Sequence, residues 1–182
     1  MRWSDELPLA ACPTIFGIRC STPTVIRLYQ MKYFQEIKQI VAENSLLAEG
    51  CSETDIASLQ NTLPYKMPDA YHEFLLLFGR NPAGFLAGSE VKFGYLQSMR
   101  EEASEILLRN DAKILADDEF VFFLHQNYSF YTFKLGIDDP DILLYIEGGE
   151  KFEQQTNHGS FSVFIKQQFQ SHLAGGYLKR LS

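Results

Sequence analysis

The chain has no apolar run that approaches the roughly 20 residues of a membrane-spanning helix. Its densest apolar stretches, residues 74–78 and 120–124, are each five residues long, so we expect no membrane contact. Three cysteines, Cys12, Cys20 and Cys51, are too few for a disulfide framework and lack Cys-x-x-Cys spacing. The sequence therefore predicts a folded protein of a reducing compartment, the cytoplasm, without a metal or another cofactor.

Basic clusters are also missing. The chain has 16 Lys and Arg against 23 Asp and Glu, a formal charge of -7, and direct binding of nucleic acid is not expected without a concentration of positive charge. Residues 111–153 hold ten acids and three bases, which is 3 minus 10, or -7. The whole excess of negative charge therefore lies in this one segment.

Hydrophobic periodicity divides the chain into an extension and one domain. Residues 1–22 have no steady period and predict an N-terminal extension, with Met31 as an alternative start. Residues 23–182 are long enough for a single domain with its own core. Within it, apolar residues recur every three or four positions over residues 25–41, which predicts an amphipathic helix.

The remaining pattern predicts an α+β fold in which helices pack on a central antiparallel sheet. A Ser-x-x-Asp cap at Ser52 and Asp55 begins the next helix, which Pro64 ends. Further helices are expected over residues 68–79 and 96–107, and a C-terminal helix is expected after Ser160 as its capping residue. Aromatic and β-branched residues predict strands at residues 120–125, 128–134 and 142–147, the first two joined by a tight turn at Gln126 and Asn127.

Residues capable of catalysis do not form a recognisable site. The histidines are far apart in sequence. His125 at the end of a strand is a candidate general base, and together with a nearby acid it leaves an unrecognised hydrolase as a remote alternative. The adjacent acids Asp117 and Asp118 point apart and do not form an acid–base pair. Ser160 lacks the Gly-x-Ser-x-Gly motif of a nucleophile. The acids of residues 138–141 lack the ligand spacing of a calcium loop and indicate a solvated turn. We therefore expect no enzyme.

Short motifs in a fixed order give the chain a family resemblance. Residues 50–56 (Gly-Cys-Ser-Glu-Thr-Asp-Ile) and 67–75 (Met-Pro-Asp-Ala-Tyr-His-Glu-Phe-Leu) resemble the SUKH superfamily, in particular its Smi/Knr cell-wall-regulator branch. Residues 120–130 are similar to the central hairpin of that family. Asp139-Pro140 before Leu144-Tyr145 is similar to a later strand, and residues 160–165 to the closing helix.

The resemblance implies a non-enzymatic α+β binding domain. Many bacterial members are immunity proteins that neutralise toxins, often nucleases, and others are regulatory scaffolds for endogenous partners. Clustered carboxylates speed the encounter with a basic protein, although acidic turns also serve solubility. An uncovered aromatic strand edge would also permit a homodimer. The acids expected to contact a basic toxin, or another basic protein, are Asp117, Asp118, Glu119, Asp138, Asp139, Asp141, Glu147 and Glu150.

Overall fold

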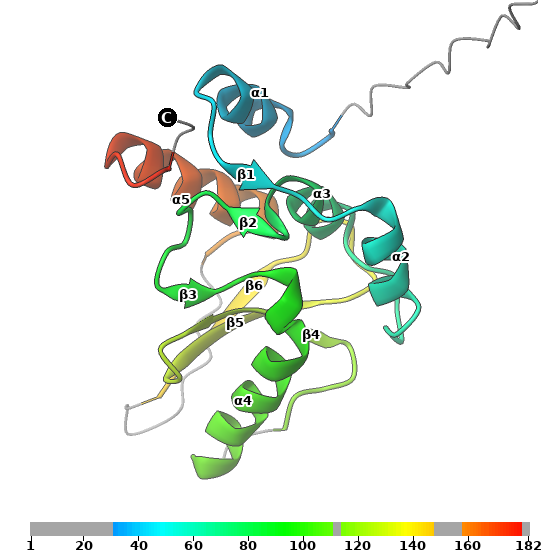
Figure 1. Ribbon diagram of the computed structural model, residues 1–182. Helices are drawn as coiled ribbons and strands as arrows, with labels where there is room; N and C mark the ends of the chain where they lie inside the picture. Colours follow the sequence, from blue (N-terminus) through cyan, green and yellow to red (C-terminus); the bar gives the residue numbers. More distant parts are fainter. Residues whose placement is uncertain (1–30, 111–113, 148–157, 180–182) are drawn as a thin grey trace, which may run out of the picture.

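The computed structural model describes residues 31–110, 114–147 and 158–179, and its elements confirm the α+β prediction (Figure 1). In chain order they are α1 (Gln35–Glu43), β1 (Ala48–Glu49), α2 (Glu53–Gln60), α3 (Asp69–Phe78), β2 (Asn81–Pro82), β3 (Ser89–Glu90), a 3₁₀ turn (Phe93–Tyr95), α4 (Leu96–Arg109), β4 (Glu119–His125), β5 (Ser129–Lys134), β6 (Ile142–Ile146) and α5 (Phe161–Ala174).

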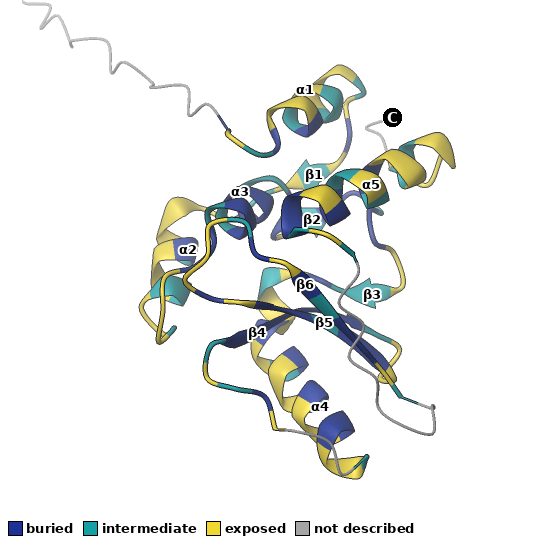
Figure 2. Ribbon diagram, turned by 180° about the vertical axis from the view of Figure 1, so that it is seen from behind, coloured by how far each residue is buried: buried dark blue, intermediate teal, exposed yellow. Residues whose placement is uncertain are grey.

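A four-stranded antiparallel sheet in the order β3-β4-β5-β6 forms the middle of the molecule, and β1 and β2 form a separate small sheet. Figure 1 shows α3 and α5 on one side of the larger sheet and α4 on the other. Residues 119–124 of β4 are all buried (Figure 2). Helices on both faces explain why this strand is a continuous apolar run and does not alternate with polar residues.

The β4–β5 hairpin closes as the sequence predicted. Gln126 and Asn127 connect the strands, and their φ angles are 48° and 56°. Two successive left-handed residues give a turn whose twist matches that of the flanking strands. The hairpin sets the register in which His125 is opposite Ser129, and an irregularity between Val121 and Phe123 then shifts this register so that Glu119 is opposite Lys134.

An aromatic core joins the two helices above the sheet to its central strands. Phe161, the first residue of α5, is fully buried, and it packs edge-on against Tyr71 of α3, Phe122 of β4 and Phe133 of β5. The ring centroids are 5.1–5.6 Å apart at interplanar angles of 78–84°. This is the favoured arrangement for aromatic quadrupoles, so the packing stabilises one relative position of these elements.

The first helix is shorter than the periodicity predicted. α1 begins at Gln35, residues 32–34 form bends, and residues 25–30 lie outside the described part of the chain. The backbone N–H groups of residues 32–34 all donate to the carboxylate of Glu73 on α3, over distances of 2.6–3.1 Å. Glu73 is itself buried, with 2% of its surface exposed. A distant carboxylate thus binds the N–H groups that precede α1, where the helix was predicted to continue.

Removing this acceptor is expected to destabilise the fold. Glu73→Ala leaves buried N–H groups without a partner and should lower the free energy of unfolding by about 2 kcal/mol, measured by urea denaturation. Glu105→Gln, which changes an exposed carboxylate of α4, should stay within about 0.5 kcal/mol of wild type. Equal effects of the two substitutions would contradict the role assigned to Glu73.

Candidate functional site

Strand register brings most of the predicted partner-binding acids to one end of the sheet. Glu119 at the start of β4 is opposite Lys134 at the end of β5, and Phe133 is opposite Ile142 at the start of β6. The segments that flank these strand ends are therefore neighbours. We call their surface the acidic end and define it by Asp117, Asp118, Asp138, Asp139 and Asp141.

Two predicted residues lie apart from the acidic end or cannot be placed. Glu147 follows Ile146, which pairs with Ser129 at the other end of the sheet, about 15 Å away along β6. There its carboxylate lies 3.4 Å from Arg109 and accepts a hydrogen bond from Asn110. Glu150 lies outside the described residues. The predicted acids therefore do not form a single surface.

Glu119 is not part of the exposed surface. Only 2% of the residue is exposed, and its Oε2 accepts the N–H of Ala116 at 2.8 Å while the hydroxyl of Tyr145 donates to Oε1 at 3.5 Å. Burial, with the nearby Glu119 charge, raises the pKa of Tyr145 to about 12. Glu119 therefore stabilises the start of β4, and its contact with a partner stays a prediction.

Asp139 caps α5 from the β5–β6 connection. Its Oδ1 accepts the backbone N–H of Ser162 at 2.8 Å, and its Oδ2 accepts the hydroxyls of Ser162 at 2.7 Å and Ser160 at 2.8 Å. Ser160 occupies the N-cap position of this helix as predicted, but its side chain makes no capping hydrogen bond, because that hydroxyl donates to Asp139. The carboxylate does the work of a helix cap.

Lysines neutralise part of the acidic end. Lys66 lies 2.9 Å from Asp138 and holds the pKa of that carboxyl below its usual range, and Lys134 lies 3.3 Å from Asp118. Asp117 and Asp141 are exposed, and no base among the described residues lies within ion-pair distance of either. The five acids of the acidic end and the nearby Asp69 together face three lysines, Lys32, Lys66 and Lys134. Six carboxylates and three lysines give a net charge of -3.

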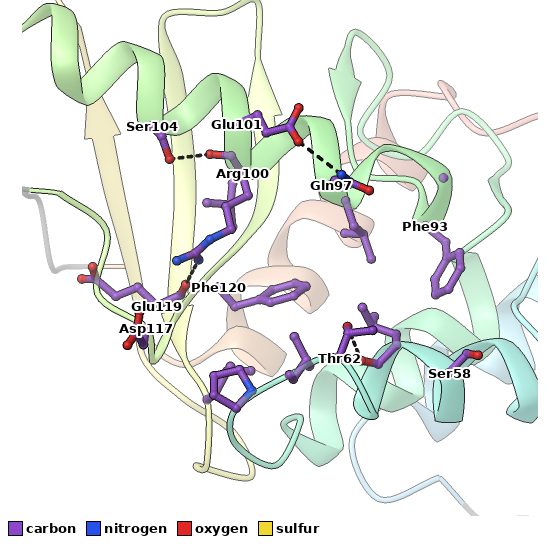
Figure 3. A pocket seen from close by; sticks show the side chains of 17 residues that line it. Ser58, Thr62, Phe93, Gln97, Arg100, Glu101, Ser104, Asp117, Glu119 and Phe120 are labelled. Carbon is purple, nitrogen blue, oxygen red and sulfur yellow. Dashed lines mark hydrogen bonds between the residues drawn. The ribbon is translucent and has the colours of Figure 1, made fainter.

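A groove opens beside the acidic end, between α2 and α4 and over the start of β4 (Figure 3). Its volume is about 1220 Å³, above the range of typical small-ligand pockets. We call it the α2–α4 groove. It is lined by Ser58, Leu59, Thr62, Leu63, Pro64, Phe93, Gly94, Leu96, Gln97, Arg100, Glu101, Ser104, Asp117, Glu119, Phe120, Val121 and Leu135. No single sequence pattern predicts this groove, because its apolar residues come from separate segments.

A capping box begins α2, which forms one wall of the groove. It confirms the predicted Ser-x-x-Asp start of this helix. The Ser52 hydroxyl accepts the N–H of Asp55, and the Asp55 carboxylate accepts the N–H of Ser52 at 3.0 Å. Arg80 also lies 2.7 Å from Asp55. The hydrogen bond from Arg80, with those from Ser52, lowers the pKa of Asp55 to about 2.

Arg100 on α4 joins the opposite wall to the segment before β4. Its Nη1 donates to the carbonyl of Glu119 at 2.6 Å (Figure 3). Its Nη2 donates to the carbonyl of Ala116 at 3.4 Å. Arg100 is the only cationic side chain among the residues that line the groove, whereas Glu101 and Asp117 on the same rim are exposed carboxylates. The groove therefore presents excess negative charge to an incoming molecule.

Further acids lie on α4, outside the segment that holds the excess charge in the sequence. Partial burial and then the like charges of Glu90, Glu105 and Glu101 raise the pKa of Glu102. Like charges raise a carboxyl pKa where they are not compensated by cations. The net charge along the sequence does not reveal this cluster, because cations such as Arg80 balance its acids in number. In the fold, Arg80 pairs with an acid elsewhere.

His125 forms a cross-strand hydrogen bond. Its Nδ1 lies 2.8 Å from the hydroxyl of Ser89, its partner on β3. A catalytic serine needs such a base, and the base needs a third group to orient it. Within the described residues no carboxylate forms a hydrogen bond with the His125 ring.

No group of three or more His, Cys, Asp or Glu in residues 31–110, 114–147 and 158–179 is placed to hold a metal ion. None of the helices in the same ranges is long and apolar enough to cross a membrane.

Comparison with known proteins decides the family. The model of the SMI1/KNR4 family (SUKH-1) matches residues 50–167, from the turn before α2 into α5. The chain belongs to the SMI1/KNR4 family (SUKH-1). No curated protein and no solved structure matches it. Membership confirms the predicted SUKH resemblance and is consistent with an immunity or regulatory protein-binding function.

Substitution of Asp139 tests whether this residue of the SMI1/KNR4-family domain is structural or binds a partner. Asp139→Ala removes the acceptor at the start of α5 and should lower the free energy of unfolding by about 1–2 kcal/mol, measured by chemical denaturation. Asp141→Ala, two residues away and exposed, should change it by less than about 0.5 kcal/mol. An unchanged free energy of unfolding in Asp139→Ala would make this residue a candidate for partner binding again.

The Asp55–Arg80 pair predicts a dependence of stability on pH. Because the folded-state pKa of Asp55, about 2, lies below the ordinary value of about 4, its stabilising effect is present above pH 4 and is lost as pH falls toward 2. Asp55→Asn should flatten this loss, measured as the urea midpoint from pH 6 to pH 3. Asp141→Asn should keep the wild-type slope; an unchanged slope in Asp55→Asn would refute the assignment.

Proposed function

We propose that this chain is an immunity protein that binds and neutralises a basic, nuclease-type bacterial toxin in the cytoplasm, without catalysis of its own. Family membership over residues 50–167 carries the proposal, because it supports a protein-binding function. The remaining negative charge of the acidic end supports a basic partner. Asp117 and Asp141 are its exposed carboxylates without an ion pair in the described part of the chain.

Electrostatics gives the proposed mode its physical basis. A nuclease that binds nucleic acid carries a basic cleft, and a carboxylate-rich surface speeds the encounter with such a cleft and disfavours acidic partners. Binding across the cleft would exclude the nucleic acid. The carboxylates of the acidic end do not all contribute equally. Those of Asp118 and Asp138 already lie beside Lys134 and Lys66, and they therefore attract a basic partner less.

A regulatory scaffold that binds an endogenous protein is the alternative. The same family match favours it, because the family is consistent with regulatory as well as immunity functions, and a shared fold does not fix the partner. The two functions differ in what the partner does and in whether binding abolishes its activity.

Neutralisation is the property to measure. The full chain is used to capture its partner from native cells, and the purified partner is assayed for nuclease activity with increasing amounts of the chain. The proposal expects a basic partner whose activity falls to zero near a 1:1 ratio. A partner without toxic activity, or one that stays active when saturated, would overturn it in favour of the scaffold.

Charge reversal then tests the surface. Asp117→Lys with Asp141→Lys should slow association with the captured toxin about ten-fold at low salt and flatten its dependence on salt, measured by stopped-flow or biosensor kinetics. Glu43→Lys with Glu49→Lys, on α1 and β1, changes the net charge equally and is the matched control. Equal rates for the two double variants would reject a localised acidic surface.

A further inference from the structure

We propose that the α2–α4 groove binds an amphipathic, basic segment of the partner, with aliphatic or aromatic anchors in the groove and Lys or Arg at its rim. The inference rests on the proposed function in one respect, that the partner is a basic protein. It adds the site of docking and the chemistry of the docked segment.

The interior of the groove is suited to apolar anchors. Phe120 and Val121 of β4 and Leu135 lie in its lining and are buried, while Leu63 and Phe93 are half-buried. Covering such partly exposed apolar surface favours a complex, because it removes apolar area from water. The volume of about 1220 Å³ is large enough for several side chains rather than one small ligand.

Apolar surface continues beyond the mouth of the groove. Tyr65 is 53% exposed and Ile137 is 50% exposed, and they follow the lining residues Pro64 and Leu135 closely in the chain. The N–H of Gly136 donates to the carbonyl of Lys66 at 2.8 Å, so the two loops that carry these side chains lie side by side. A segment in the groove would therefore find further apolar contacts where it leaves.

The charge of the rim selects a basic segment. Glu101 and Asp117 are exposed, and Arg100, the one cation in the lining, already donates to two backbone carbonyls on the protein itself. A Lys or Arg beside the anchors would gain charge-assisted hydrogen bonds to the two carboxylates, whereas an acidic segment would be repelled. Apolar lining and acidic rim together distinguish this site from an acidic cluster alone.

Synthetic peptides test the groove without the native partner. The full chain, labelled at leucine and valine methyl groups, is titrated with an amphipathic helical peptide of leucine and lysine, and separately with one of leucine and glutamate. We expect the lysine peptide to shift the methyl signals of Leu59, Leu63 and Val121, and the glutamate peptide to bind at least about ten-fold more weakly.

Substitutions in and outside the groove show where the lysine peptide binds. Leu63→Gln in the groove should weaken the lysine peptide about five-fold, whereas Leu173→Gln, a similarly half-buried leucine of α5, should leave its affinity unchanged. Glu101→Gln with Asp117→Asn should reduce the preference for lysine over glutamate. Methyl shifts confined to other surfaces, equal affinity for the two peptides, or equal effects of the two leucine variants would overturn the inference.

The inference and the proposed function fail separately. If the captured toxin is neutralised but neither it nor the lysine peptide perturbs the groove, the docking site is wrong and the immunity function stands. If the lysine peptide binds the groove as expected but the native partner has no toxic activity, the groove stands and the immunity function is wrong.

Discussion

The arrangement of helices and strands in this domain depends on the burial of one ring, Phe161, at the start of α5. It packs edge-on against Tyr71 of α3, Phe122 of β4 and Phe133 of β5, and also against Phe34 just before α1. Because close-packed interiors do not deform continuously, these contacts fix the helices above the sheet relative to its central strands. Asp139 secures the same point through its hydrogen bonds to the first turn of α5.

Many acids of this chain are structural, and this changes how its negative charge is understood. Glu73 binds the backbone before α1, Glu119 binds the backbone before β4, and Asp139 caps α5. Each carboxylate accepts hydrogen bonds from N–H or hydroxyl donors of the protein itself. The surface left for recognition is smaller than the sum of charges suggests, and it borders the α2–α4 groove at Asp117.

Local chemistry was enough to predict the elements but not their long-range contacts. The Ser52 cap, the turn at Gln126 and Asn127 and the strands of the hairpin depend on neighbouring residues, and they were confirmed. Glu73 and Asp139 reach donors 39 or more and 21 or more residues away, respectively, which no local pattern encodes. The groove was missed for the same reason, since α2, α4 and β4 each supply part of it.

Hydrogen–deuterium exchange of the full chain with its captured partner tests whether a protein binds at the α2–α4 groove and the acidic end. We expect slower exchange on binding in residues 58–64, 93–104, 114–121 and 138–141, with α1 and the end of α5 unchanged. Protection confined to α1, β1 and α5, with these segments exchanging as in the free protein, would contradict this expectation.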